Sequence, residues 1–254
     1  MRARPTVILL HGGPGFDHSG YKPIFTPLTD VAQLLYYDHR GQGRSDRSSP
    51  ASWNLAQWAD DLRGLCDALG IERPIIFGQS FGGMVAMAYA ARHPEHPGKL
   101  VFSSTSARMD YPRMFAKFGS HDGELGAIAR AFWTDPSAAT WAPYADRAMP
   151  AYQRTPRDPE AAARTIHTPD VLFHFAGGEQ KTMDLRAGLA RVQVPTLVLG
   201  GEDDPVCPIE TQAEIAAALP PGLMRFERFA GCGHGVYRDD PARAFALLRE
   251  FIAT

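Results

Sequence analysis

The feature that most constrains this chain is the pentapeptide Gly78-Gln79-Ser80-Phe81-Gly82, which lies between a strand pattern at 74–77 and a helix pattern at 81–92. A Gly-x-Ser-x-Gly sequence in that context predicts a sharp, strained turn that lifts the serine hydroxyl above a sheet. Glycine fits both flanks because side chains there would collide with neighbouring segments. Ser80 is therefore the candidate nucleophile, and the N–H of Phe81 is a candidate oxyanion donor at the start of the helix.

A serine hydroxyl needs a general base to act as a nucleophile at neutral pH. His234 is the best candidate, because it lies in the loop Gly-Cys-Gly-His-Gly (231–235), directly after the last predicted strand. The order nucleophile, acid, histidine along the chain fits the turn motif. The acid would follow the strand predicted at 196–199, where Glu202, Asp203 and Asp204 compete. Asp204 is preferred because Pro-Val-Cys-Pro follows it and fixes the loop, with Asp203 as the alternative.

Two further loops follow the first two predicted strands. In His11-Gly12-Gly13-Pro14-Gly15 the glycines let the backbone approach a bound carbonyl oxygen, and the Gly13 N–H would be the second oxyanion donor. His11 is interpreted as a brace for this loop rather than as the base. The sequence Asp-His-Arg-Gly-Gln-Gly-Arg-Ser at 38–45 is interpreted as an internally hydrogen-bonded, structural loop.

The remaining pattern predicts an α/β fold of parallel strands covered on both faces, because short apolar runs alternate with helical periodicity. The expected strands are 6–10, 33–37, 74–77, 99–103, 196–199 and 225–229, the last suiting a sheet edge. Between Ser106 and Asp184 no strand is evident and aromatic residues are frequent. We expect residues 1–105 and 185–254 to form the core and 106–184 a helical lid. Its candidate substrate-binding residues are Trp133, Trp141 and Phe173.

The composition of the chain excludes several classes of function. The chain of 254 residues has a formal net charge of −2, which is no electrostatic footprint for nucleic acid or an anionic membrane. No apolar stretch approaches the roughly 20 residues of a membrane span. The cysteines, Cys66, Cys207 and Cys232, have no metal-ligand spacing and predict no disulfide framework. We therefore expect a cytoplasmic protein that acts on a small molecule without a metal or organic cofactor.

Together these motifs resemble the α/β-hydrolase superfamily: HGGPG (11–15), DHRGQGRS (38–45), GQSFGG (78–83), GEDDPVCP (201–208) and Gly233-His234. The pair HGGPG and D-x-R-G-x-G-x-S is similar to the proline iminopeptidase branch. Those enzymes use acidic lid residues to bind the free amino group of the substrate. The acids of this lid, among them Glu124, Asp146, Glu160, Asp170 and Glu179, match none of that pattern.

The resemblance also implies two strands before the HGG loop, whereas here the HGG strand begins at residue 6. About six mainly parallel strands are therefore expected, with 33–37 as an exposed edge. An exposed edge invites pairing, so a homo-oligomer formed through this edge is a hypothesis.

The sequence thus predicts a serine hydrolase that cleaves a small ester, lactone or related carbonyl compound through an acyl-enzyme on Ser80. One alternative is a proline iminopeptidase that releases N-terminal proline. An alternative of another class is a catalytically silent binding protein on a hydrolase fold.

Overall fold

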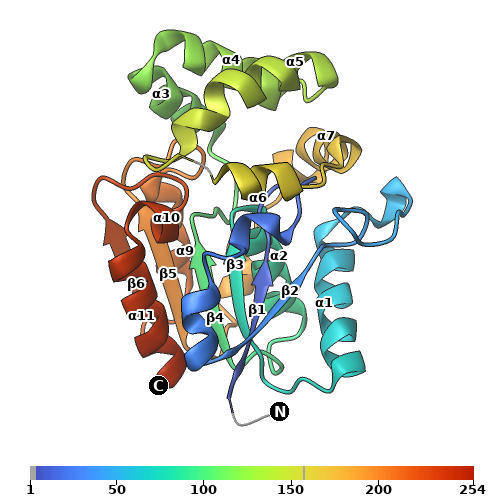
Figure 1. The fold of residues 1–254 in the computed structure, drawn as a ribbon, viewed down its shortest axis with the longest axis vertical. Coiled ribbons are helices and arrows are strands. Elements are labelled where there is room, and N and C mark those ends of the chain that lie inside the picture. Colours follow the sequence, from blue (N-terminus) through green and yellow to red (C-terminus); the bar gives the residue numbers. More distant parts are fainter. Residues whose placement is uncertain (1–3, 157) are drawn as a thin grey trace.

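The structure, a computed structural model, describes residues 4–156 and 158–254. Its centre is one parallel sheet of six strands in the order β2-β1-β3-β4-β5-β6 (Figure 1). The strands are β1 (Thr6–Leu10), β2 (Gln33–Tyr37), β3 (Ile75–Gln79), β4 (Lys99–Ser103), β5 (Thr196–Gly201) and β6 (Met224–Phe229). The predicted strands are confirmed, and the more polar β6 lies at an edge as expected.

Alternate strand residues face opposite sides of this sheet, so the core is split into two layers. In β1, Ile8 and Leu10 pack on one side, while Val7 and Leu9 pack on the other. The first layer is covered by α1 (Leu55–Leu69), α2 (Phe81–Arg92), α8 (Arg186–Leu189) and α9 (Ile209–Ala218). The second is covered by α10 (Val236–Asp239), α11 (Pro241–Ala253) and the 3₁₀ helices η1 (His18–Tyr21) and η2 (Thr26–Asp30).

Helix α1 follows the signals that its sequence carries at both ends. The side chain of Asn54 accepts a hydrogen bond from the N–H of Gln57 and caps the first turn. Gly70 ends the helix in the left-handed conformation, with φ of 57°, which glycine adopts without the steric cost of a Cβ. The short 3₁₀ helix η3 (Pro50–Ser52) precedes it.

In its described residues, the connection from β4 to β5 contains helices, turns and irregular segments but no strand. It contains α3 (Tyr111–His121), α4 (Gly123–Thr134), α5 (Ala138–Pro143), η4 (Tyr144–Ala148), η5 (Met149–Tyr152), α6 (Pro159–Arg164), α7 (Pro169–Gly177) and η6 (Glu179–Lys181). We call residues 106–184 the lid segment; its boundaries with the core stay a prediction. Figure 1 shows α3, α4 and α5 beyond the carboxyl ends of the strands. An apolar cluster that includes Met114, Phe118 and Phe132 holds these helices together.

The order in which the chain adds strands to the sheet changes direction at β1: β2 is added on one side and β3 on the other. β1 pairs with β2 on one side and with β3 on the other, so the connections after β1 and β3 diverge. In open parallel sheets this reversal leaves a crevice at the carboxyl ends of the strands, where ligands bind. The HGGPG loop follows β1 and Ser80 follows β3, so both reach this crevice.

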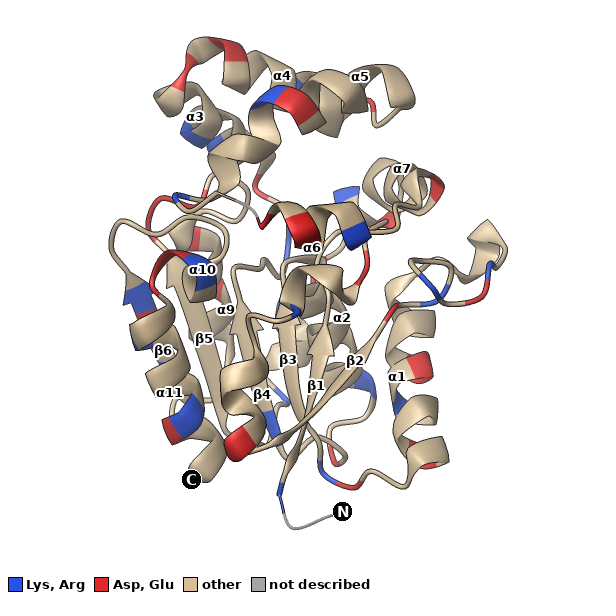
Figure 2. Ribbon diagram, in the orientation of Figure 1, with Lys and Arg blue, Asp and Glu red and all other residues tan. Residues whose placement is uncertain are grey.

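No helix in the described part of the chain is long and apolar enough to cross a membrane. Figure 2 shows acidic and basic residues interspersed along the helices, with neither sign gathered in one region of the view. Strand β2 forms one edge of the sheet, as predicted. Pairing of that edge with a second chain stays a prediction, which the oligomeric state in solution would test.

Helix α2 approaches the end of β1 so closely that Gly82 has no room for a side chain. A Cβ atom on Gly82 would clash with the carbonyl oxygen of Leu10 and would lie 2.7 Å from that of His11. Both neighbours are backbone atoms and cannot rotate away. The expectation that glycine at this position avoids a collision is confirmed.

We predict that Gly82→Ala lowers the free energy of unfolding by about 1–3 kcal/mol or more, because the added methyl group overpacks this contact. Gly64→Ala is the matched control. Gly64 lies exposed in α1 with nothing within 4 Å of an added Cβ, so alanine should stabilise that helix slightly. Urea unfolding of both variants measures the difference. Equal midpoints for Gly82→Ala and the wild type would contradict the packing argument.

Candidate active site

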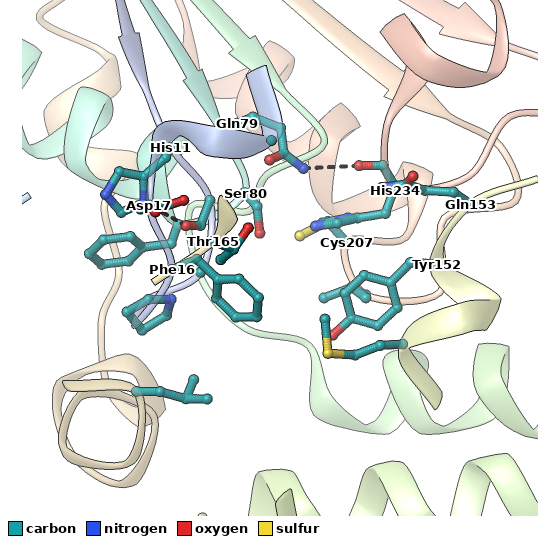
Figure 3. A pocket seen from close by; sticks show the side chains of 18 of the residues that line it. His11, Phe16, Asp17, Gln79, Ser80, Tyr152, Gln153, Thr165, Cys207 and His234 are labelled. Atoms are coloured by element: carbon teal, nitrogen blue, oxygen red, sulfur yellow. Dashed lines mark hydrogen bonds between the residues drawn. The ribbon is translucent and has the colours of Figure 1, made fainter. Parts of the chain in front are cut away.

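Ser80 joins β3 to α2 in a strained conformation, with φ of 54° and ψ of −122°. Such backbone angles cost a non-glycine residue about 1–3 kcal/mol and persist only where the surroundings enforce them. Here the N–H of Ser80 donates to the carbonyl oxygens of Ser103 and Ser104, both at 3.1 Å. The hydroxyl of Thr105 donates to the Ser80 carbonyl oxygen at 2.7 Å. The turn is therefore held from the adjacent strand, and it leaves the Ser80 side chain lining a cavity (Figure 3).

His234 forms a buried pair with Asp204. Its Nδ1 lies 2.8 Å from Oδ2 and 3.0 Å from Oδ1 of the carboxylate. Oδ1 also accepts the N–H groups of Val206 and Cys207, at 2.8 and 2.9 Å, which fixes the carboxylate in the loop after β5. A carboxylate at Nδ1 favours the tautomer with the proton on that nitrogen, which leaves the lone pair on Nε2. His234 and Ser80 line the same cavity.

The two neighbouring acids are engaged elsewhere. Asp203 pairs with Arg154 at 2.5 Å and Glu202 pairs with Arg228 at 3.0 Å. Both of these carboxylates are partly exposed, whereas that of Asp204 is fully buried. Of the three acids that the sequence left in competition, the structure sets Asp204 against the histidine.

His11 has both ring nitrogens occupied within the HGGPG loop. Nδ1 lies 2.8 Å from the carbonyl oxygen of Gly12, and Nε2 accepts the N–H of His39 at 3.1 Å. Burial lowers the pKa of His11, so the ring is neutral at pH 7. It braces the loop, in agreement with the interpretation from sequence. Gly13, two residues later, lines the cavity together with Ser80 and Phe81.

The loop at 38–45 is built around the carboxylate of Asp38. The carboxylate accepts hydrogen bonds from Nδ1 and from the backbone N–H of His18, each at 2.8 Å. It also accepts one from the backbone N–H of Arg44, at 2.8 Å. Burial opposes ionisation of Asp38, but these hydrogen bonds outweigh it and lower the pKa of the carboxyl well below its usual value. With its acceptors occupied, Asp38 is structural, as expected for this loop.

The cavity lies between the core loops and the lid segment and has a volume of about 140 Å³. The core supplies Gly13, Ser80, Phe81 and His234. The lid segment supplies an aromatic wall of Phe132, Trp133, Trp141, Tyr144 and Tyr152. Figure 3 shows Ser80 and His234 on this cavity, with Tyr152 beside the histidine.

Of the aromatic residues proposed from sequence to bind substrate, Trp133 and Trp141 line the cavity and Phe173 does not. Phe173 packs partly buried against the lid cluster, while the preceding residue, Leu172, faces the cavity. Successive residues of an α-helix point about 100° apart. The phase of α7 therefore turns Phe173 away from the cavity, so the prediction that Phe173 lines it is wrong.

Sequence reasoning missed Tyr152, which contacts the histidine directly. Its carbonyl oxygen accepts the N–H of His234 at 2.6 Å, and its ring centroid lies 5.2 Å from that of the imidazole. The available signal was Gly233: a Cβ atom there would clash with the carbonyl oxygen of Tyr152. A glycine beside a candidate catalytic histidine can thus mark the close approach of a second segment. Gln79, the first variable residue of the serine motif, also supports this loop, because its Nε2 donates to the His234 carbonyl oxygen at 3.0 Å.

Two carboxylates of the core anchor the lid segment through its backbone. Asp239 accepts the N–H groups of Arg154, at 3.1 Å, and Thr155, at 2.8 Å. The same carboxylate accepts the N–H of Gly233 at 2.8 Å, so it ties the lid to the histidine loop.

Asp17, two residues after the end of the HGGPG loop, is the second anchor. Its carboxylate accepts the N–H of Ile166 at 2.9 Å and pairs with Arg44 at 2.5 Å. Nη2 of Arg44 in turn donates to the carbonyl oxygen of Arg164 at 2.9 Å. Helix α6 and its flanks are therefore fixed to the core at both ends.

Asp204, Cys207 and His234 bring three potential metal-ligand atoms within 4.8 Å of one another. The arrangement fits a hydrogen-bonded pair better than a ligand set. His234 Nδ1 and the carboxylate already bind each other, and burial raises the pKa of the Cys207 thiol well above its usual value. A thiolate ligand would have to form against that burial.

Comparison with known proteins agrees with this architecture. The family described as alpha/beta hydrolase fold matches residues 5–241. The chain belongs to this family. It is 29% identical over 259 residues to a putative carbamate hydrolase, RutD, of Pseudomonas syringae pv. syringae (strain B728a), with 98% of this chain and 94% of the relative covered. It is also 29% identical to the proline iminopeptidase of Lactobacillus helveticus (strain DPC 4571), covering 98% of this chain and 90% of the relative.

Among solved structures, the fold is similar to that of the enol-lactonase from Burkholderia xenovorans LB400. The TM-score is 0.74 at 22% identity, with 99% of this chain and 92% of that chain covered. These proteins are hydrolases with different substrates. The chain is accordingly a hydrolase of this family, and its own bond specificity must come from its own cavity.

We predict that Asp239→Ala destabilises the protein by about 1–3 kcal/mol, because Gly233, Arg154 and Thr155 lose a shared acceptor. Urea unfolding measures the loss, and limited proteolysis should cut faster near residues 150–156. Asp46→Ala at an exposed position is the control. An unfolding midpoint equal to that of the control would show that Asp239 is not an anchor.

Proposed function

We propose that this chain is a serine hydrolase that cleaves a small ester, lactone or related carbonyl substrate through an acyl-enzyme on Ser80. One observation carries the proposal. Ser80, on a strained turn, shares a cavity with His234, whose Nδ1 is bound by the fully buried carboxylate of Asp204. Three separate loops at the carboxyl ends of the strands thus supply a nucleophile, a base and a residue that orients the base.

Each group has a role in the proposed reaction. His234 Nε2 takes the proton of the Ser80 hydroxyl as Oγ attacks the carbonyl carbon, and Asp204 stabilises the imidazolium that results. The N–H groups of Gly13 and Phe81 stabilise the oxyanion. Collapse of the intermediate breaks the bond to the leaving oxygen, which receives the proton from Nε2. Water, deprotonated by His234, then hydrolyses the acyl-enzyme by the same steps.

The cavity supports a small and partly apolar substrate. A volume of about 140 Å³ is close to that of an engineered cavity of about 150 Å³ that accepts benzene. Its walls at Phe132, Trp133 and Trp141 are aromatic, as is usual for sites that bind small organic molecules.

Proline iminopeptidase activity is the competing function, because a relative of that name matches nearly the whole chain. A peptide substrate with a free N-terminal amino group needs an available carboxylate in the site to bind its ammonium form. None of the lid acids Glu124, Asp146, Glu160, Asp170 and Glu179 lines the cavity. Asp17 and Asp158 do, but Asp17 is bound by Arg44 and Ile166, and Asp158 accepts the N–H of Glu160 as the cap of α6. Both acids on the cavity are thus engaged within the protein, Asp158 through one oxygen, and this favours the ester or lactone.

We predict that a fluorophosphonate probe labels the protein at Ser80, and that Ser80→Ala loses both labelling and turnover. Circular dichroism should find the variant folded, since alanine is small enough for this turn. Mass spectrometry of the labelled peptide identifies the site. An unlabelled wild-type protein would instead support a binding function on a silent hydrolase fold.

Asp204→Asn should lower kcat by about 10⁴-fold, because an amide favours the wrong tautomer of His234. Asp203→Asn is the matched control, because this partly exposed neighbour pairs with Arg154 instead; its kcat should stay within a few-fold of wild type. Steady-state hydrolysis of p-nitrophenyl butyrate measures both. A larger loss in the control than in Asp204→Asn would reverse the assignment of the two acids.

A substrate panel separates the two enzyme functions. We expect turnover of short p-nitrophenyl esters or lactones and none of prolyl p-nitroanilide, because Asp17 and Asp158, the acids that line the cavity, already accept hydrogen bonds from the protein. Cleavage of the anilide alone would favour the proline iminopeptidase.

A further inference from the structure

Arg238 is the arginine among the described residues that line the cavity. It lies in α10, four residues after His234, and lines the same cavity as Ser80. Nη2 donates to the carbonyl oxygen of Gly20 at 2.8 Å, which fixes one end of the group. The ring of Tyr237 lies beside it, with its centroid 5.3 Å from the guanidinium carbon.

This cation has no anionic partner in the described part of the chain. No carboxylate lies within 4.0 Å of it, and its Nε is buried without a hydrogen-bond acceptor. The other described arginines without an ion pair, Arg4, Arg47, Arg73, Arg130 and Arg191, are all exposed, whereas Arg238 is partly buried. A charge withdrawn from water without a partner is costly, and such groups are concentrated at functional sites.

Three acids adjoin Arg238 in the sequence or line the same cavity, and each is engaged by other groups; Asp158 is engaged through one oxygen, which accepts the N–H of Glu160. Asp239, the next residue, accepts three backbone N–H groups as the lid anchor. Asp17, on the same cavity, is bound by Arg44 and Ile166. The acceptors of Asp239 and Asp17 are therefore committed to other donors.

A second polar side chain lies close to Arg238. Gln153, from the lid segment, lines the cavity, and the donor of its amide group is Nε2. Gly235 lies between the two side chains: an added Cβ would be 3.4 Å from Cδ of Arg238 and 3.2 Å from Nε2 of Gln153. A guanidinium and an amide thus flank the backbone next to His234. Together they offer N–H donors of the kind that binds a carboxylate.

We propose that the substrate carries a carboxylate in addition to the bond that is cleaved, and that Arg238, assisted by Gln153, binds it. This rests on the proposed hydrolase function and narrows its substrate class to acidic esters or lactones. Arg238 is a specificity-determining residue: it holds the part of the substrate that does not react.

The test compares each acidic ester with its neutral amide. In the first pair, mono-p-nitrophenyl adipate and the p-nitrophenyl ester of adipamic acid, the charge lies on the acyl side. In the second pair, 4-butanoyloxybenzoate and 4-butanoyloxybenzamide, it lies on the leaving group. The measured quantity is the ratio of kcat/KM, acid over amide, after subtraction of the uncatalysed rate.

We expect the wild-type protein to prefer the acid in at least one pair. Arg238→Gln should lower that ratio roughly 10- to 100-fold, the range for a lost hydrogen bond to a charged group. Arg238→Lys should recover part of it, because the charge returns without the planar fork. Arg191→Gln, at an exposed arginine without an ion pair, is the matched control and should leave the ratio unchanged.

Failure of this inference differs from failure of the proposed function. A wild-type enzyme that hydrolyses the amides as well as the acids, or an Arg238→Gln variant that slows both equally, would overturn the carboxylate site and leave the hydrolase intact. If no ester is turned over, calorimetry of adipate binding to Ser80→Ala and to the Ser80→Ala, Arg238→Gln double variant still decides. Equal affinities would overturn the site, and a loss in the double variant would support it.

Discussion

The close approach of helix α2 to the end of strand β1 is the constraint on which the site depends. Gly82 touches the backbone of Leu10 and His11, so the loops after β1 and β3 are held together at backbone distance. Ser80 can then keep its strained conformation, because the adjacent strand end accepts its N–H. The two N–H groups proposed to bind the oxyanion, those of Gly13 and Phe81, lie on the two sides of this contact. A hydrolytic site of this kind is set first by backbone packing and only then by side chains.

Sequence predicted well what local pattern determines. Buried parallel strands are short and apolar throughout, and a left-handed glycine ends α1, so these elements could be located from the chain alone. The serine motif and the histidine loop were recognisable for the same reason. The choice between Asp203 and Asp204 stayed open because the two are adjacent and chemically identical. Only the fold reveals that the N–H groups of Val206 and Cys207 hold Asp204 inward, while Asp203 pairs with Arg154 outside.

What sequence did not predict depends on contacts between distant segments. Phe173 was misplaced because the phase of a short lid helix is set by packing, not by its composition. Tyr152 and Arg238 carry no motif: Tyr152 reaches His234 across more than eighty positions of sequence, and Arg238 reaches Gly20 across more than two hundred. Such residues can be inferred in advance only where a glycine, such as Gly233, records the close approach from the other side.

The two lid anchors have a consequence for how such an enzyme can change its substrate. Asp239 fixes the lid next to His234 and Asp17 fixes it next to the HGGPG loop, and the chain between these points carries α6 over the cavity. Each anchor is one carboxylate that serves a lid backbone group and a core loop at once. An insertion or deletion between 155 and 166 would therefore displace His234 or the HGGPG loop as well as reshape the cavity. Substitutions that change substrate specificity are more easily tolerated in α4 and α5, which lie beyond the anchors. There a side chain can change without shifting Ser80 or His234.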